Sequence, residues 1–181
     1  RLNLSGGRIN RENLNEAFSW IDDEISEQYD KNLYYRDWSN FYFFHEKLKK
    51  KEFLPEDLEK IIKKYLMMVD GVKNVITKKE ILSSNETDHI SLRLKNMIHV
   101  KKSADVFVLL EPGYLYRNPH GTSHGSPYDY DAHVPLLFAK KERDKNAISA
   151  HAETVDIAPT ILNLLNIKLN NSFDGKVLPI R

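Results

Sequence analysis

The sequence contains no cysteine, and this absence removes several kinds of chemistry at once. Without a thiol, the chain cannot carry a cysteine nucleophile, a disulfide or a cysteine-rich zinc site. The absence does not by itself choose a cellular compartment.

Long apolar runs are also missing. No stretch approaches the roughly 18 consecutive apolar residues of a membrane-spanning helix, and no signal peptide is recognisable. The chain opens at Arg1 without an initiator methionine. We interpret this start as that of a trimmed product or of a piece of something longer, so missing targeting signals carry little weight.

Neither sign of charge dominates. The chain has 27 basic and 26 acidic residues, for a net charge of +1. A non-specific nucleic-acid-binding protein carries a basic surplus, so we expect no nucleic-acid-binding surface. The length of 181 residues, with 41% hydrophobic and 29% charged residues, is typical of a soluble globular protein with one domain or slightly more.

Hydrophobic periodicity predicts alternating helices and strands, without internal repeats. We expect helices at residues 10–28, 55–70, 78–83, 88–98 and 154–165, and strands at 33–44 with a break near Asp37, 72–77, 105–111 and 134–138. Asp156 is expected to cap the last helix and Asn166 to end it in a left-handed conformation. Residues 140–145 are interpreted as a charged linker. The alternation indicates α/β or α+β architecture.

The stretch at residues 121–138 is the most informative part of the chain. Small and polar residues surround His124, and an apolar run that predicts a buried strand follows at 134–138. Such a histidine suits a metal ligand, because imidazole binds metals and glycines let other groups approach. One histidine cannot build a site, however, and no paired-ligand signature such as HExxH occurs. From the residues alone, His124 is either a metal ligand or an ordinary loop histidine.

Residues 121–138, with the sequence GTSHGSPYDYDAHVPLLF, resemble the C-terminal metal motif of the alkaline phosphatase superfamily. They are most similar to the PafA-type bacterial alkaline phosphatases, which also resemble type I phosphodiesterases and nucleotide pyrophosphatases. Residues 104–113 resemble the strand before the motif, and residues 154–167 and 173–176 resemble the closing helix and final turn. The resemblance covers roughly residues 55–178 and is strong over 104–176.

This resemblance implies an α/β fold, namely the C-terminal part of an alkaline-phosphatase-like core with a mixed sheet and flanking helices. It also implies a division of the chain. Residues 1–103 would form a helical and aromatic-strand insert or cap-like region. Residues 104–181 would form the C-terminal part of the core and carry the metal-ligand loop.

The resemblance further implies a zinc-dependent phosphomonoester hydrolase, in which a Thr or Ser nucleophile attacks phosphorus beside two zinc ions. His124 matches the family's zinc-ligating histidine and is the one site residue that carries over. Residues 122–126 would shape its approach to the metal. The nucleophile and the other ligands precede the matched region in the family order, so we expect them upstream of Arg1. The chain alone is therefore expected to be inactive, and its parent to act on phosphate esters in the periplasm or outside the cell.

Three tempting partners of His124 are set aside. His120 lies four residues earlier, without a helical pattern that would pair the two side chains. His133 is expected to order the loop or cap the following strand. The Asp88-His89 pair lacks the glycine that follows this step in the family, so we expect it to cap a helix.

Two alternatives remain open. The first is a phosphodiesterase or nucleotide pyrophosphatase of the same superfamily. The second is a non-catalytic structural or binding module that keeps the fold, with tyrosines around the loop as a binding surface; packing of the loop is the competing interpretation of these tyrosines. They are Tyr114, Tyr116, Tyr128 and Tyr130.

Overall fold

The computed structural model describes residues 6–116, 120–139, 147–168 and 172–180, which belong to two compact units, Arg1–His133 and Val134–Arg181. Each unit is considered by itself. None of the helices in these ranges combines the length and apolar character needed to cross a membrane.

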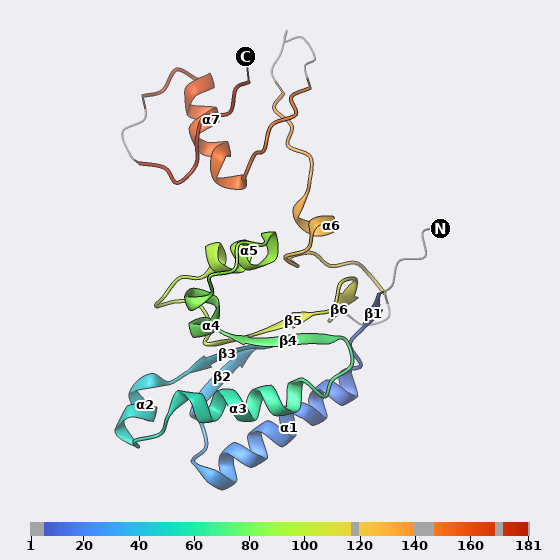
Figure 1. The fold of residues 1–181 in the computed structure, drawn as a ribbon, viewed down its shortest axis with the longest axis vertical. Coiled ribbons are helices and arrows are strands. Elements are labelled where there is room, and N and C mark those ends of the chain that lie inside the picture. Colours follow the sequence, from blue (N-terminus) through green and yellow to red (C-terminus); the bar gives the residue numbers. More distant parts are fainter. Residues whose placement is uncertain (1–5, 117–119, 140–146, 169–171, 181) are drawn as a thin grey trace. The chain divides into compact units, whose positions relative to one another are not determined.

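The first unit is built around a four-stranded antiparallel sheet with the strand order β2-β3-β5-β4 (Figure 1). Its strands are β2 (Tyr34–Asp37), β3 (Asn40–Phe43), β4 (Val72–Thr77) and β5 (Val106–Leu110). A second, two-stranded sheet pairs β1 (Gly7–Arg8) in parallel with β6 (Tyr114–Leu115). Parallel and antiparallel pairing with flanking helices confirms the predicted mixed α/β class.

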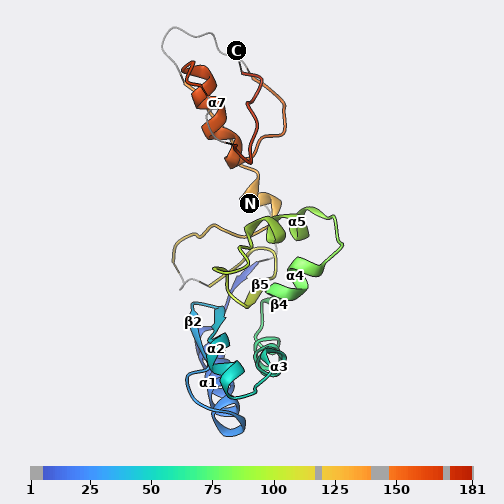
Figure 2. The same cartoon turned by 90° about the vertical axis from the view of Figure 1, so that its left-hand side faces the viewer.

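Helices lie on both sides of the four-stranded sheet (Figures 1 and 2). On one side lie α1 (Arg11–Gln28) and α3 (Pro55–Leu66), and on the other lie α4 (Lys78–Ser83) and α5 (His89–Met97). The buried residues of α1 and α3 recur every three or four positions, so each helix presents one apolar stripe. These stripes form a single core with β3, β4 and β5. The short helix α2 (His45–Lys50) follows β3.

Local signals fix where these helices begin. The Asn10 side chain accepts hydrogen bonds from the backbone N–H groups of Glu12 and Asn13 at 2.8 and 3.3 Å. Pro55 occupies the first turn of α3, where its missing N–H costs little. The predicted helices at 10–28, 78–83 and 88–98 and the strands at 33–44, 72–77 and 105–111 are confirmed within one or two residues. The helix from Pro55 ends earlier than expected, at Leu66.

The second unit contains a 3-10 turn, η1 (Thr154–Asp156), that leads into α7 (Ile157–Leu164). Asp156 precedes α7 as predicted, but its side chain makes no capping bond to that helix. Its carboxylate instead accepts the backbone N–H groups of Glu153 at 3.0 Å and Lys176 at 2.8 Å. Asp156 therefore joins the start of the helix to the segment that returns after it. Asn166 has a φ of 54°, which confirms the left-handed stop.

The prediction of a strand at residues 134–138 is wrong. These residues are irregular, and the Leu137 side chain is 87% exposed. A strand needs a neighbour that satisfies its backbone N–H and C=O groups, and no described residue pairs with this segment. The apolar composition of the run indicated burial but carried no information about a partner. The charged linker predicted at residues 140–145 lies outside the described residues.

The predicted division into an insert or cap-like region at residues 1–103 and the C-terminal part of the core at residues 104–181 stays a prediction. The boundary between the two compact units lies thirty residues later, after His133.

Candidate metal-ligand loop and its supports

His124 lies in an exposed, irregular segment of the first unit. Gly121 and Gly125 on either side of it have φ values of 98° and 99°, in the left-handed region that favours glycine. Apart from each glycine and its chain neighbours, no described atom lies within 4 Å of the place where a Cβ would stand at either position. The two glycines therefore bend the backbone on either side of His124, whose side chain is exposed.

Two tyrosines fasten the end of this loop to β5 and to the turn that follows it. Tyr128 is buried, and its hydroxyl donates to the Leu110 carbonyl at 2.5 Å, at the end of β5. The Tyr130 hydroxyl accepts the Gly113 N–H at 3.0 Å. Both flank the start of the short helix α6 (Asp129–Ala132). Packing of the loop is thus confirmed for Tyr128.

Two arginines hold the loop at its ends. The Arg93 guanidinium, from α5, donates to the Pro127 carbonyl at 2.7 Å and to the Asp129 carboxylate at 2.8 Å. Arg8, from β1, donates to the Gly121 carbonyl at 2.8 Å. His124 is therefore exposed on a segment whose two ends are fixed. These two clamps were not predicted, because each arginine lies more than thirty residues from its partner in the sequence.

Asp131 supports the backbone directly after His124. Its carboxylate accepts the Ser126 N–H at 2.6 Å. This bond, with further contributions from the Gly125 N–H and from the charge of His124, holds the pKa of Asp131 below its usual value. Asp131 thus braces residues 124–126 from within the same segment.

Protonation of Asp131 is expected to loosen this brace. Because the pKa of Asp131 in the folded state is lowered, this contribution to stability is complete above the usual value of 3.8 and is lost as the pH falls through the folded value. The Ser126 amide proton should report this as a titration with a midpoint below 3.8 in NMR spectra. Asp131→Asn should abolish the titration. A midpoint above 3.8, or its persistence in Asp131→Asn, would contradict the assignment.

The structure also places the three residues or pairs that were set aside as partners of His124. His120 is exposed, and His133 ends α6 by donating its backbone N–H to the Asp129 carbonyl at 2.9 Å. Asp88 caps α5 by accepting the N–H groups of Ile90 and Ser91, so the helix-cap interpretation is confirmed. Within the described ranges, no group of three or more His, Asp or Glu side chains could hold a metal ion. His124 as a metal ligand stays a prediction.

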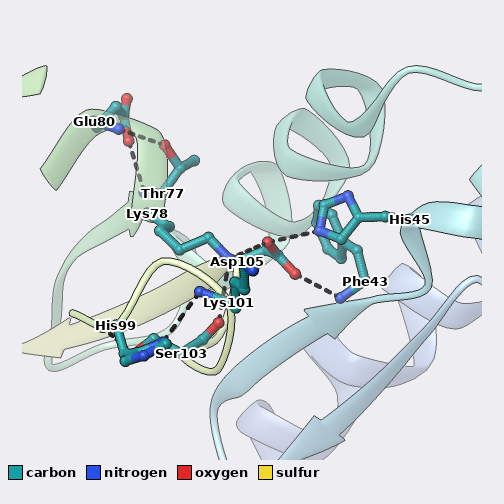
Figure 3. A network of polar contacts seen from close by, with 9 residues as sticks. All are labelled: Phe43, His45, Thr77, Lys78, Glu80, His99, Lys101, Ser103 and Asp105. Atoms are coloured by element: carbon teal, nitrogen blue, oxygen red, sulfur yellow. Dashed lines mark hydrogen bonds and ion pairs between the residues drawn. The ribbon is translucent and has the colours of Figure 1, made fainter. Parts of the chain in front are cut away.

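A buried carboxylate forms a second polar centre, at the start of β5 (Figure 3). The Asp105 side chain is 9% exposed. One of its oxygens lies 2.9 Å from Nε2 of His45 and 2.8 Å from Nζ of Lys78. The other accepts the Phe43 N–H at 2.8 Å.

The backbone of Asp105 extends the same junction. Its N–H donates to the Phe41 carbonyl at 2.7 Å, and its carbonyl accepts the Lys78 N–H at 2.8 Å. β3, β5 and the start of α4 therefore meet at one residue. Both carboxylate oxygens are engaged, which indicates a structural role. One signal in the sequence marks this residue, namely a charged side chain beside an otherwise apolar strand.

Comparison with known proteins relates the chain to bacterial phosphatases. It is 30% identical over 114 residues to the alkaline phosphatase PhoV of Synechococcus elongatus and 30% identical over 122 residues to the alkaline phosphatase PafA of Elizabethkingia meningoseptica. These matches cover 63% and 67% of this chain. A protein of Myroides odoratus named as a calcium-transporting ATPase is 33% identical over 114 residues, or 62% of this chain. No family model matches.

The chain spans about a fifth of the length of these curated relatives, since the matches cover 21% or 22% of each. A crystal structure of wild-type PafA superposes with a TM-score of 0.77 at 23% identity. That superposition covers 97% of this chain and 33% of the PafA chain. The fold is therefore that of a part of PafA, and the resemblance noted in the sequence is confirmed.

Proposed function

Because this chain is a relative of the PafA-type alkaline phosphatases over part of their length, we propose that it forms part of a zinc-dependent phosphomonoester hydrolase. In this proposal His124 binds one of two zinc ions. The observation that carries it is the setting of His124, which is exposed between two left-handed glycines on a loop fastened at both ends. Contacts around a metal ligand help to orient it, and the contacts at both ends of this loop support the proposed role.

Because the matches cover 21% and 22% of the lengths of PhoV and PafA, we propose that the nucleophile and the remaining ligands precede Arg1. We propose further that the chain alone does not turn over substrate. The zinc ions would stabilise the attacking and leaving oxygens around phosphorus. In this proposal, the chain positions the backbone that carries His124, through the bond of Asp131 to the Ser126 N–H and through the arginine and tyrosine contacts near the loop ends. By the same relationship, the site of action is proposed to be the periplasm or the cell exterior.

Two preparations test the proposal with one chromogenic phosphate monoester. This chain, supplied with zinc, should give no hydrolysis above a zinc-only blank. A longer chain that includes the upstream segment should hydrolyse the ester, lose activity with a chelator and regain it with zinc.

Turnover by this chain alone that disappears in His124→Ala would overturn the proposed inactivity. A longer chain that shows no metal-dependent turnover would overturn the proposal that the protein is a hydrolase. If the longer chain hydrolyses a chromogenic diester faster than the monoester, the proposed activity becomes that of a phosphodiesterase of the same superfamily.

A further inference from the structure

A small cavity lies between the start of α1 and the β2–β3 hairpin, within the first unit. Its volume is about 190 Å³, well below the roughly 300–1,000 Å³ of pockets for drug-sized ligands, so it suits a smaller one. Its polar lining consists of two guanidinium groups, one amide and two hydroxyls, with an indole beside them. These belong to Arg11, Arg36, Asn15, Ser39, Tyr116 and Trp38.

The charged side chains that line this cavity are all positive. Both charged groups are arginines, and within the described part of the chain no carboxylate lines the cavity. No described carboxylate forms an ion pair with Arg11 or Arg36. The cavity therefore disfavours cations and attracts anions.

Arg36 is held in one orientation. Its guanidinium carbon lies 3.5 Å from the centre of the Phe18 ring, and one nitrogen donates to the Trp38 carbonyl at 3.2 Å. Phe18 in turn packs edge-on against Phe41 in the core. A guanidinium has five N–H donors in a rigid fork, and the bond to Trp38 uses one of them. The group is thus fixed by a ring face and a carbonyl while most of its donors remain for a ligand.

Arg11 stands where a cation is electrostatically unfavourable. It is exposed and is the first residue of α1, at the positive end of the helix dipole. An anion beside it would interact favourably with both the guanidinium and the helix end. A bound anion would therefore remove an unfavourable interaction rather than only add a contact.

The cavity is also lined by a buried hydroxyl group, that of Tyr116, whose hydrogen-bonding capacity is not satisfied by the described residues. The Tyr116 oxygen is shielded from solvent and makes no hydrogen bond of normal geometry within the described ranges, with the Ser39 side chain beside it. Burial raises the pKa of Tyr116 to about 12, so the hydroxyl stays protonated and can donate. A buried donor of this kind is costly unless a ligand or water accepts its proton.

We propose that this cavity binds a small oxyanion of the phosphate type between Arg11 and Arg36. Guanidinium groups bind tetrahedral oxyanions through paired N–H donors, and the Tyr116 and Ser39 hydroxyls complete the set on the inner side. Trp38 rims the opening with 66% of its surface exposed, so a bound ligand lies near an indole. The inference does not depend on His124 or on the proposed hydrolase.

Tryptophan fluorescence tests this binding on the whole chain. The sequence has two tryptophans, so Trp20→Phe leaves Trp38 as the reporter. In that background, inorganic phosphate titrated at constant ionic strength against chloride should give a saturable change. Arg11→Gln should raise the half-saturating concentration about tenfold, because one charge-assisted contact is lost. Lys49→Gln, which removes an exposed cation of α2 outside the cavity, should leave it unchanged.

A linear response, an equal response to chloride, or the same half-saturation in Arg11→Gln would overturn the site. Arg11 carries the test because its side chain is exposed, whereas Arg36→Gln also removes a contact with the core. Arg36→Lys keeps the charge without the fork, and it should bind more weakly than the parent. An aromatic phosphate monoester that saturates at lower concentration than inorganic phosphate would assign the site to a phosphorylated small molecule, and equal or weaker binding would assign it to phosphate itself.

Discussion

Replacing His124 by alanine is expected to lower kcat/KM for a phosphate monoester by at least about a hundredfold in a chain that carries the proposed upstream residues. Loss of a residue that merely orients a metal ligand already costs 10–100-fold, so loss of the ligand should cost no less. The measurement is steady-state hydrolysis at saturating zinc. Metal content should fall in parallel, which provides a readout that does not depend on turnover.

His120→Ala is the matched control. His120 is an exposed histidine four residues from His124, so its loss removes an imidazole of the same segment without touching the proposed ligand. Activity and zinc content should stay close to those of the parent, and both variants should keep its unfolding midpoint because each side chain is exposed. Equal losses in the two variants would reject His124 as the ligand.

Removal of the Asp105 carboxylate should be the most destabilising of the substitutions considered for this chain. Asp105→Ala leaves the Phe43 N–H without its acceptor and takes the shared anion away from Lys78 and His45. Breaking a buried ion pair or leaving a buried donor unsatisfied is costly, so we expect a loss of about 2–3 kcal/mol in the free energy of unfolding. Urea denaturation followed by circular dichroism measures it.

Two comparisons sharpen that experiment. Asp105→Asn keeps a side-chain oxygen that can accept the Phe43 N–H but removes the negative charge, so it should fall between the parent and Asp105→Ala. Lys79→Ala breaks an ion pair with Glu56 that is exposed to solvent, and it should change stability little. A loss for Asp105→Ala no larger than that for Lys79→Ala would show that the Asp105 network does not support the fold.

Most elements of the first unit could be predicted because their signals are local. The α1 helix needs an Asn10 cap and apolar residues at helical spacing, and both lie within one stretch of sequence. The prediction of a strand at residues 134–138 was wrong because a strand depends on a signal that is not local. An apolar run indicates a strand only if another strand pairs with it, and pairing is a property of the whole fold.

The contacts that support the candidate site could not be predicted either, because they join residues that are far apart in the sequence. His124 could be selected because its neighbours in the sequence resemble a family motif. Its anchors could not, since Arg93 reaches Pro127 across 34 positions and Arg8 reaches Gly121 across 113. Asp105 meets His45 across 60 positions. Contacts of this kind follow from the order of the strands, which periodicity does not encode.

That strand order also constrains how the first unit can form. β5 lies between β3 and β4 although it follows both in the sequence, so the sheet cannot close until residues 106–110 have been made. Among the described strands of this sheet, β2 and β3 are the pair that can form before then. During synthesis, the edges of β3 and β4 that face β5 remain open for the time needed to add the intervening chain, and open edges pair with other molecules. We therefore expect the open edges of β3 and β4 to favour aggregation just before β5 emerges.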